Sequence, residues 1–276
     1  MKKAKSTIWV VVSMLIFAVG AEAETITIFD SNATIVDGNS YDTVVVKGDG
    51  TVVDMTGGTV TKLITMNDST FNMSGGSITS SVYSYDSSVL NLSNGSLSQV
   101  YSRGKSRINI SGDVSVSGVS PYDLSFVSIS GNSTVSFVQF MQNDNASIVN
   151  ITGGQIGTLV ADRKDAGIVN ISGGTLQEIY YMGTNYTGRI NIIGHDLNAQ
   201  PYGGTGYGEI TGYWNDDMPF SIRLQSQDSY AYVDLYDGII PPNCVSRPNS
   251  DLNGDCRVNF EDFSKMSNEW LANGLE

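Results

Sequence analysis

Histidine, cysteine and positive charge are scarce in this sequence. Its 276 residues contain one histidine, two cysteines, and 15 lysines and arginines against 28 aspartates and glutamates, for a formal net charge of −13. One histidine cannot build a histidine-rich metal cluster, and a histidine-based catalytic triad would need His195 itself as its base. An acidic surface repels nucleic acid and anionic lipid, so nucleic acid is not an expected partner, whereas cations such as Ca²⁺ suit it.

Long apolar runs are absent beyond the first 23 residues. The opening segment, MKKAKSTIWVVVSMLIFAVGAEA, has a basic start, an apolar stretch from Ile8 to Val19 and a small-x-small site at Ala21 to Ala23. This order is typical of a secretory signal peptide over residues 1–23, and an uncleaved N-terminal anchor is the alternative. Cleavage before Glu24 would move the net charge to −15. We therefore expect an exported protein, extracellular or at the cell surface, with no membrane insertion after cleavage.

One short unit is abundant, and GIVNISGGTL at residues 167–176 is an example. The polar residue in the middle of each copy recurs at intervals of 18 to 22 residues, at Asp54, Asn72, Asn91, Asn109, Ser128, Asn150, Asn170 and Asn191. A period near 20 residues indicates a solenoid, because one coil cannot bury its own apolar face and must stack on its neighbours.

Each copy predicts two or three short strands separated by corners. Val169 and Ile171 flank Asn170, which places the apolar pair on one face of a strand and the amide on the other. Gly173 and Gly174 turn the chain, and a second apolar set follows them. Strands of successive coils are then expected to pair in parallel at a spacing of about 4.8 Å.

The repeated asparagine has two interpretations. Five copies fit the N-x-S/T rule for glycosylation: Asn72, Asn91, Asn109, Asn150 and Asn170. The alternative is a ladder of side chains that hydrogen-bond to one another along the rod, and we expect this ladder because each asparagine lies between two strand residues. Three tyrosines, Tyr83, Tyr101 and Tyr180, could similarly form a stripe that stacks on a sugar, but we expect them to cover a solenoid face.

The coils over residues 50–197 resemble the right-handed parallel β-helix of bacterial surface and autotransporter-like passenger proteins, which has similar short V-N-I-S-G-G coils. A left-handed hexapeptide helix is disfavoured by the insertions, and the calcium-binding nonapeptide roll by the lack of Asp after the glycine pair. The expected fold is all-β, with a parallel β-helix over residues 24–200 and a β-strand cap over residues 201–238. In the cap, Ser221–Leu224 and Tyr230–Leu235 predict an antiparallel hairpin or short sheet. His195 and Trp214 are expected to be structural.

A linker over residues 239–249 precedes the most specific chemistry of the chain, at residues 250–276. In DLNGDCRVNFEDF, oxygen-bearing side chains occupy positions 1, 3, 5, 9 and 12 of a twelve-residue loop, and position 7 offers its backbone carbonyl. This spacing predicts a Ca²⁺ site. The expected ligands are Asp251, Asn253, Asp255, Asn259 and Asp262, with the carbonyl of Arg257. Apolar residues from Phe260 to Leu271 then recur at helical intervals.

The loop resembles a dockerin repeat, D-x-N-x-D-x-x-x-N-x-x-D, more than a usual EF-hand, because position 12 is aspartate. The resemblance covers one copy over residues 250–272, whereas a complete dockerin has two. It implies a small loop–helix module and a cohesin-like or cell-surface protein partner. Cys256 stands at position 6, where glycine is usual, and a disulfide to Cys244 is expected in an exported chain.

Three functions fit these features. The first is a non-catalytic structural or adhesive solenoid that is attached or assembled through the calcium module. The second is a polysaccharide-active enzyme similar to pectate lyases, which share the β-helix; its candidate residues are charges at the corners, Asp86, Arg103, Lys105, Arg107, Asp162, Arg163, Lys164 and Asp165. We expect these to be solvated corner charges, because no long loop is present to build a cleft. The third is a glycan-binding module without turnover.

Overall fold

The computed structural model describes residues 25–140, 147–161, 166–181, 188–200, 208–225 and 232–237. Within these ranges the chain forms 17 strands and no α-helix, and so no helix that could span a membrane. The first strands are β1 (Ile26–Phe29), β2 (Ala33–Ile35), β3 (Ser40–Val46), β4 (Val52–Met55), β5 (Thr59–Thr65), β6 (Thr70–Met73), β7 (Ser77–Ser84), β8 (Val89–Ser102) and β9 (Arg107–Pro121). They are followed by β10 (Phe126–Ile129), β11 (Thr134–Phe140), β12 (Ile148–Ala161), β13 (Ile168–Tyr181), β14 (Arg189–Gln200), β15 (Gly208–Tyr213), β16 (Pro219–Leu224) and β17 (Val233–Asp237).

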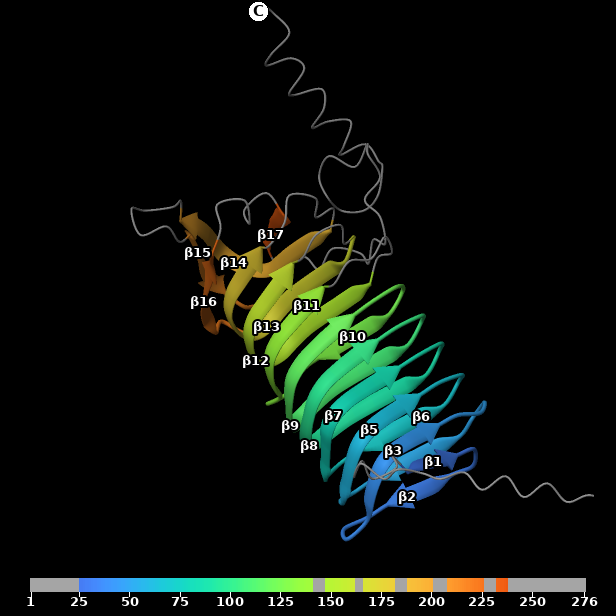
Figure 1. Cartoon of the computed structure of the whole chain (residues 1–276). Helices are drawn as coiled ribbons and strands as arrows, with labels where there is room; N and C mark the ends of the chain where they lie inside the picture. Colours follow the sequence, from blue (N-terminus) through green and yellow to red (C-terminus); the bar gives the residue numbers. More distant parts are fainter. Residues whose placement is uncertain are drawn as a thin grey trace, which may run out of the picture.

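These strands stack as a parallel β-solenoid of about eight turns, which Figure 1 shows as a rod. The first series of paired strands has the order β2, β4, β6, β8, β9, β10, β12, β13, β14, β17. The long strands β8, β9, β12 and β13 take part in it with their N-terminal parts. The second series has the order β1, β3, β5, β7, β8, β9, β11, β12, β13, β16. The same four long strands take part in it with their C-terminal parts. The parallel solenoid expected from the repeat is confirmed.

The pairing register equals the sequence period. Asn72 pairs with Asn91, and Asn91 pairs with Asn109, so each residue meets its counterpart one repeat later. Along β8 the inward Leu90 and Leu92 are buried, while Asn91 between them faces outward. Burying one such leucine contributes roughly 1.5–3 kcal/mol, and in this fold the neighbouring coils supply that burial.

Two kinds of corner need a left-handed backbone. Gly174 has a φ of 82°, and a Cβ at this position would lie 2.6 Å from the carbonyl oxygen of Gly154 in the preceding coil. The corner on the other side of the rod uses Asn67, Asp86 and Asp123, with φ of 60°, 56° and 56°. Asparagine and aspartate tolerate this conformation better than other residues with a side chain, which explains their place at these turns.

The C-terminal end of the rod differs from the predicted hairpin. β16 pairs antiparallel with β15, and the C-terminal part of β14 pairs antiparallel with β15. β17 does not pair with β16; it lies parallel to β14, with Ile190 opposite Val233, and so extends the solenoid by one more strand. Alternation in the sequence indicated the strands but carried no information about their partners.

Trp214 is structural, as expected, and fastens this end to the body of the rod. It is 3% exposed, its ring stacks on Phe220 with centroids 3.8 Å apart, and its Nε1–H donates to the carbonyl of Gly174 at 2.8 Å. The predicted signal peptide, the linker over residues 239–249 and the calcium-binding module over residues 250–276, including Cys244 and Cys256, lie outside the described residues.

Candidate functional site

A ladder of side-chain amides runs along the outer face of the first series of strands. Asn72 Nδ2 donates to Asp54 Oδ1 at 2.8 Å, and Asn91 Nδ2 donates to Asn72 Oδ1 at 2.8 Å. Asn109 Nδ2 then donates to Asn91 Oδ1 at 2.7 Å. All three bonds point the same way, because the Asp54 carboxylate can only accept and thereby orients the amides above it. The predicted ladder is confirmed.

A second run of the ladder lies beyond Ser128. Asn170 Nδ2 donates to Asn150 Oδ1 at 2.8 Å, and Asn191 Nδ2 donates to Asn170 Oδ1 at 2.7 Å. Asn170 and Asn191 are each 7% exposed. The amide nitrogen is the atom that glycosylation would modify, and here it is a buried donor inside a sheet rather than a group in a surface loop. The geometry therefore supports a structural role for the repeated asparagine.

A column of hydroxyls inside the rod was not predicted from the sequence. Thr65, Ser84 and Ser88 are fully buried; Thr65 Oγ1 donates to Ser84 Oγ at 3.1 Å, and the Ser84 and Ser88 hydroxyls are 2.8 Å apart. One coil later the Ser102 and Ser106 hydroxyls repeat this pair at 2.8 Å. Serines four residues apart on the two sides of a turn were the signal that would have indicated this pairing.

The internal hydroxyl column loses its pairing in the next two coils. Pro121 is in register with Ser102, and Phe140 occupies the corresponding place one coil further on. Each replaces the hydroxyl that would face the serine across the turn. As a result Ser125 Oγ and Ser147 Oγ are buried without a hydrogen-bond partner among the described residues.

Two tyrosines of the predicted stripe, Tyr83 and Tyr101, form a stack in which both faces of the Tyr83 ring are covered. The rings of Tyr83 and Tyr101 have centroids 4.9 Å apart and planes 12° from parallel. Lys62 Nζ lies 5.7 Å from the Tyr83 centroid and comes from the preceding coil, on the side away from Tyr101. A sugar stacks on a free ring face, so this arrangement favours covering of the solenoid over sugar binding.

The acidic corner candidate Asp86 is used by the turn itself. Its Oδ2 accepts the backbone N–H of Asn67 at 3.0 Å, and its carbonyl accepts the backbone N–H of Lys105 at 2.6 Å. These bonds tie three successive coils together at one corner. The other candidates of this kind, Asp162 to Asp165, lie outside the described residues.

The two arginine candidates of the same corner pack over aromatic rings. The Arg103 guanidinium carbon lies 4.6 Å from the centroid of Tyr122, and that of Arg107 lies 6.0 Å from Phe126. Burial raises the pKa of Tyr122 above its usual value, and the charge of Arg103 acts against this rise. These contacts give the arginines a packing role and do not assemble them with a pair of carboxylates.

A polar strip crosses the C-terminal end of the second series and was not singled out from the sequence. Arg223 of β16 is in register with Glu178 of β13 on one side and with Glu209 of β15 on the other. The Cα atoms of the two glutamates are thus two strand spacings apart, about 10 Å. Glu178 Oε1 accepts the Thr158 hydroxyl at 3.0 Å, and its Oε2 accepts the side-chain amide of Gln225.

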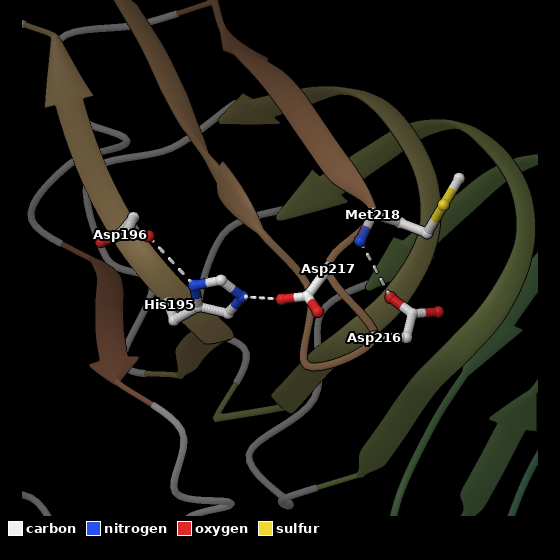
Figure 2. Close-up of polar contacts among 5 residues, drawn as sticks. All are labelled: His195, Asp196, Asp216, Asp217 and Met218. Carbon is white, nitrogen blue, oxygen red and sulfur yellow. Dashed lines mark hydrogen bonds and ion pairs between the residues drawn. The ribbon is translucent and has the colours of Figure 1, made fainter.

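His195, in the middle of β14, bridges two aspartates (Figure 2). Its Nδ1 lies 3.1 Å from Asp196 Oδ2, and its Nε2 lies 3.0 Å from Asp217 Oδ1 in the turn between β15 and β16. The hydrogen bond to Asp196 raises the pKa of His195, and the bond to Asp217 acts in the same direction. Asp216, beside this cluster in Figure 2, accepts the backbone N–H of Met218 at 3.3 Å. The imidazole therefore connects two elements of the cap, in line with the expected structural role.

No set of three His, Cys, Asp or Glu side chains that could hold a metal ion occurs in the described part of the chain. The predicted calcium ligands, from Asp251 to Asp262, lie outside that part. No protein-family model, curated protein or solved structure matches this sequence.

Proposed function

We propose that this chain is a secreted or cell-surface β-solenoid with a structural or adhesive role, attached or assembled through its C-terminal calcium-binding module. We assign it to the right-handed, short-coil architecture of autotransporter-like passengers. The observation that carries the proposal is the continuous first series of strands from β2 to β17, along which amide side chains satisfy one another. A rod of about eight coils is about 40 Å long at the usual strand spacing, which suits a spacer or scaffold.

The role of the tail rests on the ligand spacing from Asp251 to Asp262. The dockerin resemblance points to a cohesin-like or cell-surface protein as partner. We expect the full-length protein to bind one Ca²⁺ in isothermal titration calorimetry, and the double variant Asp251→Ala/Asp255→Ala to lose this binding. The matched control is Asn249→Ala, which removes an oxygen-bearing side chain two positions before the loop.

Attachment is tested with the same three proteins on the envelope fraction of the source cells, with and without a calcium chelator. We expect the full-length protein and Asn249→Ala to bind in Ca²⁺ and to be released by the chelator, and the double variant to stay in solution. Binding of the double variant at the wild-type level would remove the tail from the mechanism of attachment while leaving the solenoid intact.

Polysaccharide cleavage is the second candidate, and the strip of Glu178, Arg223 and Glu209 is the observation that favours it. Two carboxylates on either side of one arginine provide the groups that a glycosidase needs for acid and base catalysis. The assay is a panel of acidic and neutral polysaccharides with a reducing-end measurement and ultraviolet detection of unsaturated products. Turnover that is lost in Glu178→Gln and Glu209→Gln would replace the non-catalytic proposal, and absence of turnover on the panel would support it.

A further inference from the structure

Ten hydroxyl side chains form two columns on the outside of the rod, in five successive coils. We call this surface the hydroxyl face. The first column contains Thr59, Ser77, Ser96, Ser115 and Thr134, each in register with the next. The second column lies two residues further along the same strands and contains Thr61, Thr79, Ser98, Ser117 and Ser136. It is regular from Ser98 to Ser136, whereas β7 has a bulge after Ile78, at Thr79. Between the columns every coil places one buried apolar residue: Val60, Ile78, Leu97, Val116 and Val135.

The hydroxyl face is not required by the fold, in contrast to another column of hydroxyls at the glycine corner. There, Ser93 Oγ donates to the carbonyl of Met73 at 3.1 Å, and Ser111 Oγ donates to that of Leu92 at 3.4 Å, so these serines join one coil to the next. On the hydroxyl face, the described structure contains one side-chain hydrogen bond, from Ser96 Oγ to Ser77 Oγ at 3.2 Å. Of the other eight residues of the face, six are exposed, and Thr59 and Ser98 are half-buried.

The hydroxyl face is also uncharged, in a protein with a net charge of −13. Neither column contains a charged or an aromatic residue. The nearest charges are engaged elsewhere: Asp113 accepts the side-chain amide of Asn132 at 3.2 Å, and Lys62 lies over the ring of Tyr83. Such a face offers nothing to an ion and no aromatic platform to a sugar ring, but it offers many hydroxyls in fixed positions.

The spacing of these hydroxyls is set by the sheet. Neighbours in the first column are about 4.8 Å apart, as are Ser98, Ser117 and Ser136 in the second column, and the two columns are about 6 to 7 Å apart along the strand. A single hydroxyl contact gains little over the contact with water that it replaces. Many such contacts act together only if the partner is as rigid and as regular as the face, because flexible partners lose the advantage of simultaneous contact.

We propose that the hydroxyl face binds ice. A crystal of water is rigid, periodic and uncharged, with oxygen repeats comparable to the spacings of the two columns, and it needs donors and acceptors in the positions that serine and threonine provide. The buried residue between the columns holds each pair of hydroxyls in place, so little order has to be gained on binding. A dissolved flexible chain would instead have to compete with water for each hydroxyl of the face separately.

The test uses the full-length protein and measures thermal hysteresis in a nanolitre osmometer, together with partitioning of the labelled protein into a growing ice front. We expect the wild type to enter the ice and to delay crystal growth. Ser117→Lys places a charge in the regular part of the second column, between Ser98 and Ser136, and should reduce both signals several-fold. The control is Ser87→Lys, an equally exposed serine at the turn between β7 and β8, which should leave both signals unchanged.

A gain-of-function variant makes the test independent of damage to the fold. Ser96→Thr/Ser115→Thr adds two methyl groups and stiffens both side chains at χ1 without changing the hydroxyl array, so the thermal hysteresis should rise. Circular dichroism should give the same spectrum for all variants. The proposal is overturned if the wild type does not enter ice, if Ser117→Lys and Ser87→Lys behave alike, or if the wild type instead binds crystalline cellulose or chitin through Ser117.

Discussion

The amide ladder predicts that one substitution has different costs in its two runs. Asn91 and Asn170 each donate one ladder bond and accept another, so replacing either residue by alanine removes two hydrogen bonds and leaves one amide oxygen and one amide N–H of its neighbours without that partner. Water can reach the groups left behind around Asn91, which is partly exposed. Around Asn170 it cannot do so readily, because Asn170 and its neighbour Asn191 are each 7% exposed.

The magnitudes follow from this difference in burial. A hydrogen bond contributes about 0.5–1.5 kcal/mol net, and a buried group left without a partner costs about 1–3 kcal/mol. We therefore expect Asn91→Ala to lower the free energy of unfolding by about 1 kcal/mol and Asn170→Ala to lower it by about 3 kcal/mol. The reciprocal change, Ser128→Asn, would join the two runs and should raise the free energy of unfolding by about 1 kcal/mol.

The assay is urea denaturation of the full-length protein, monitored by far-ultraviolet circular dichroism. The slope of the free energy of unfolding against urea concentration should be the same for all variants. In a chain of this size 1 kcal/mol corresponds to a shift of about 2–4 °C in the melting temperature, which gives an independent check. The matched control is Thr152→Ala, an exposed hydroxyl in β12 outside the ladder. Equal costs for Asn91→Ala, Asn170→Ala and the control would refute the ladder as a source of stability.

Three further predictions concern other parts of the rod. Ser125→Ala removes a buried hydroxyl that has no partner and should leave the urea midpoint unchanged or raised, whereas Ser88→Ala breaks the internal hydroxyl column and should cost about 1–2 kcal/mol by the same measurement. Gly174→Ala should cost at least about 1–3 kcal/mol, because it forces a side chain into a left-handed conformation and against the carbonyl of Gly154; a wild-type melting curve would contradict this assignment. The folded-state pKa of His195 is raised above its ordinary value of about 6.5, so the stabilisation by the protonated imidazole is complete below that pH and is lost as the pH rises through the folded pKa. The difference in urea midpoint between wild type and His195→Gln should therefore be larger at pH 5.5 than at pH 8.5, and a difference independent of pH would show that the charge of His195 is not involved.

The sequence predicted those parts of the fold in which pairing follows from repetition. Asn72, Asn91 and Asn109 meet in register because each coil is a copy of the one before it, and the same reasoning gave the ladder. The cap has no such repeat. β17 could not be assigned to β14 from its sequence, since Val233 and Ile190 meet only after the chain has passed through β15 and β16.

Serine was the residue type whose environment the sequence concealed. Polar residues between apolar ones normally face water, and by that rule Ser84 and Ser88 would lie outside the rod. They lie inside because each hydroxyl satisfies the other across the turn, which removes the cost of their burial. The polar strip was missed for a different reason, because Glu178 and Glu209 are 31 positions apart and become neighbours of Arg223 through one parallel and one antiparallel pairing.

The single direction of the amide ladder also determines how this rod can change in length. Every coil between Asp54 and Asn109 presents the same donor to the coil before it and the same acceptor to the coil after it. A whole coil of 18 or 19 residues can therefore be duplicated or deleted there without leaving a mismatched pair, and the length changes by about 4.8 Å. A single inserted residue inside a strand would instead turn every following side chain to the wrong face. Related chains should accordingly differ by complete coils, and the hydroxyl face should lengthen or shorten in the same steps.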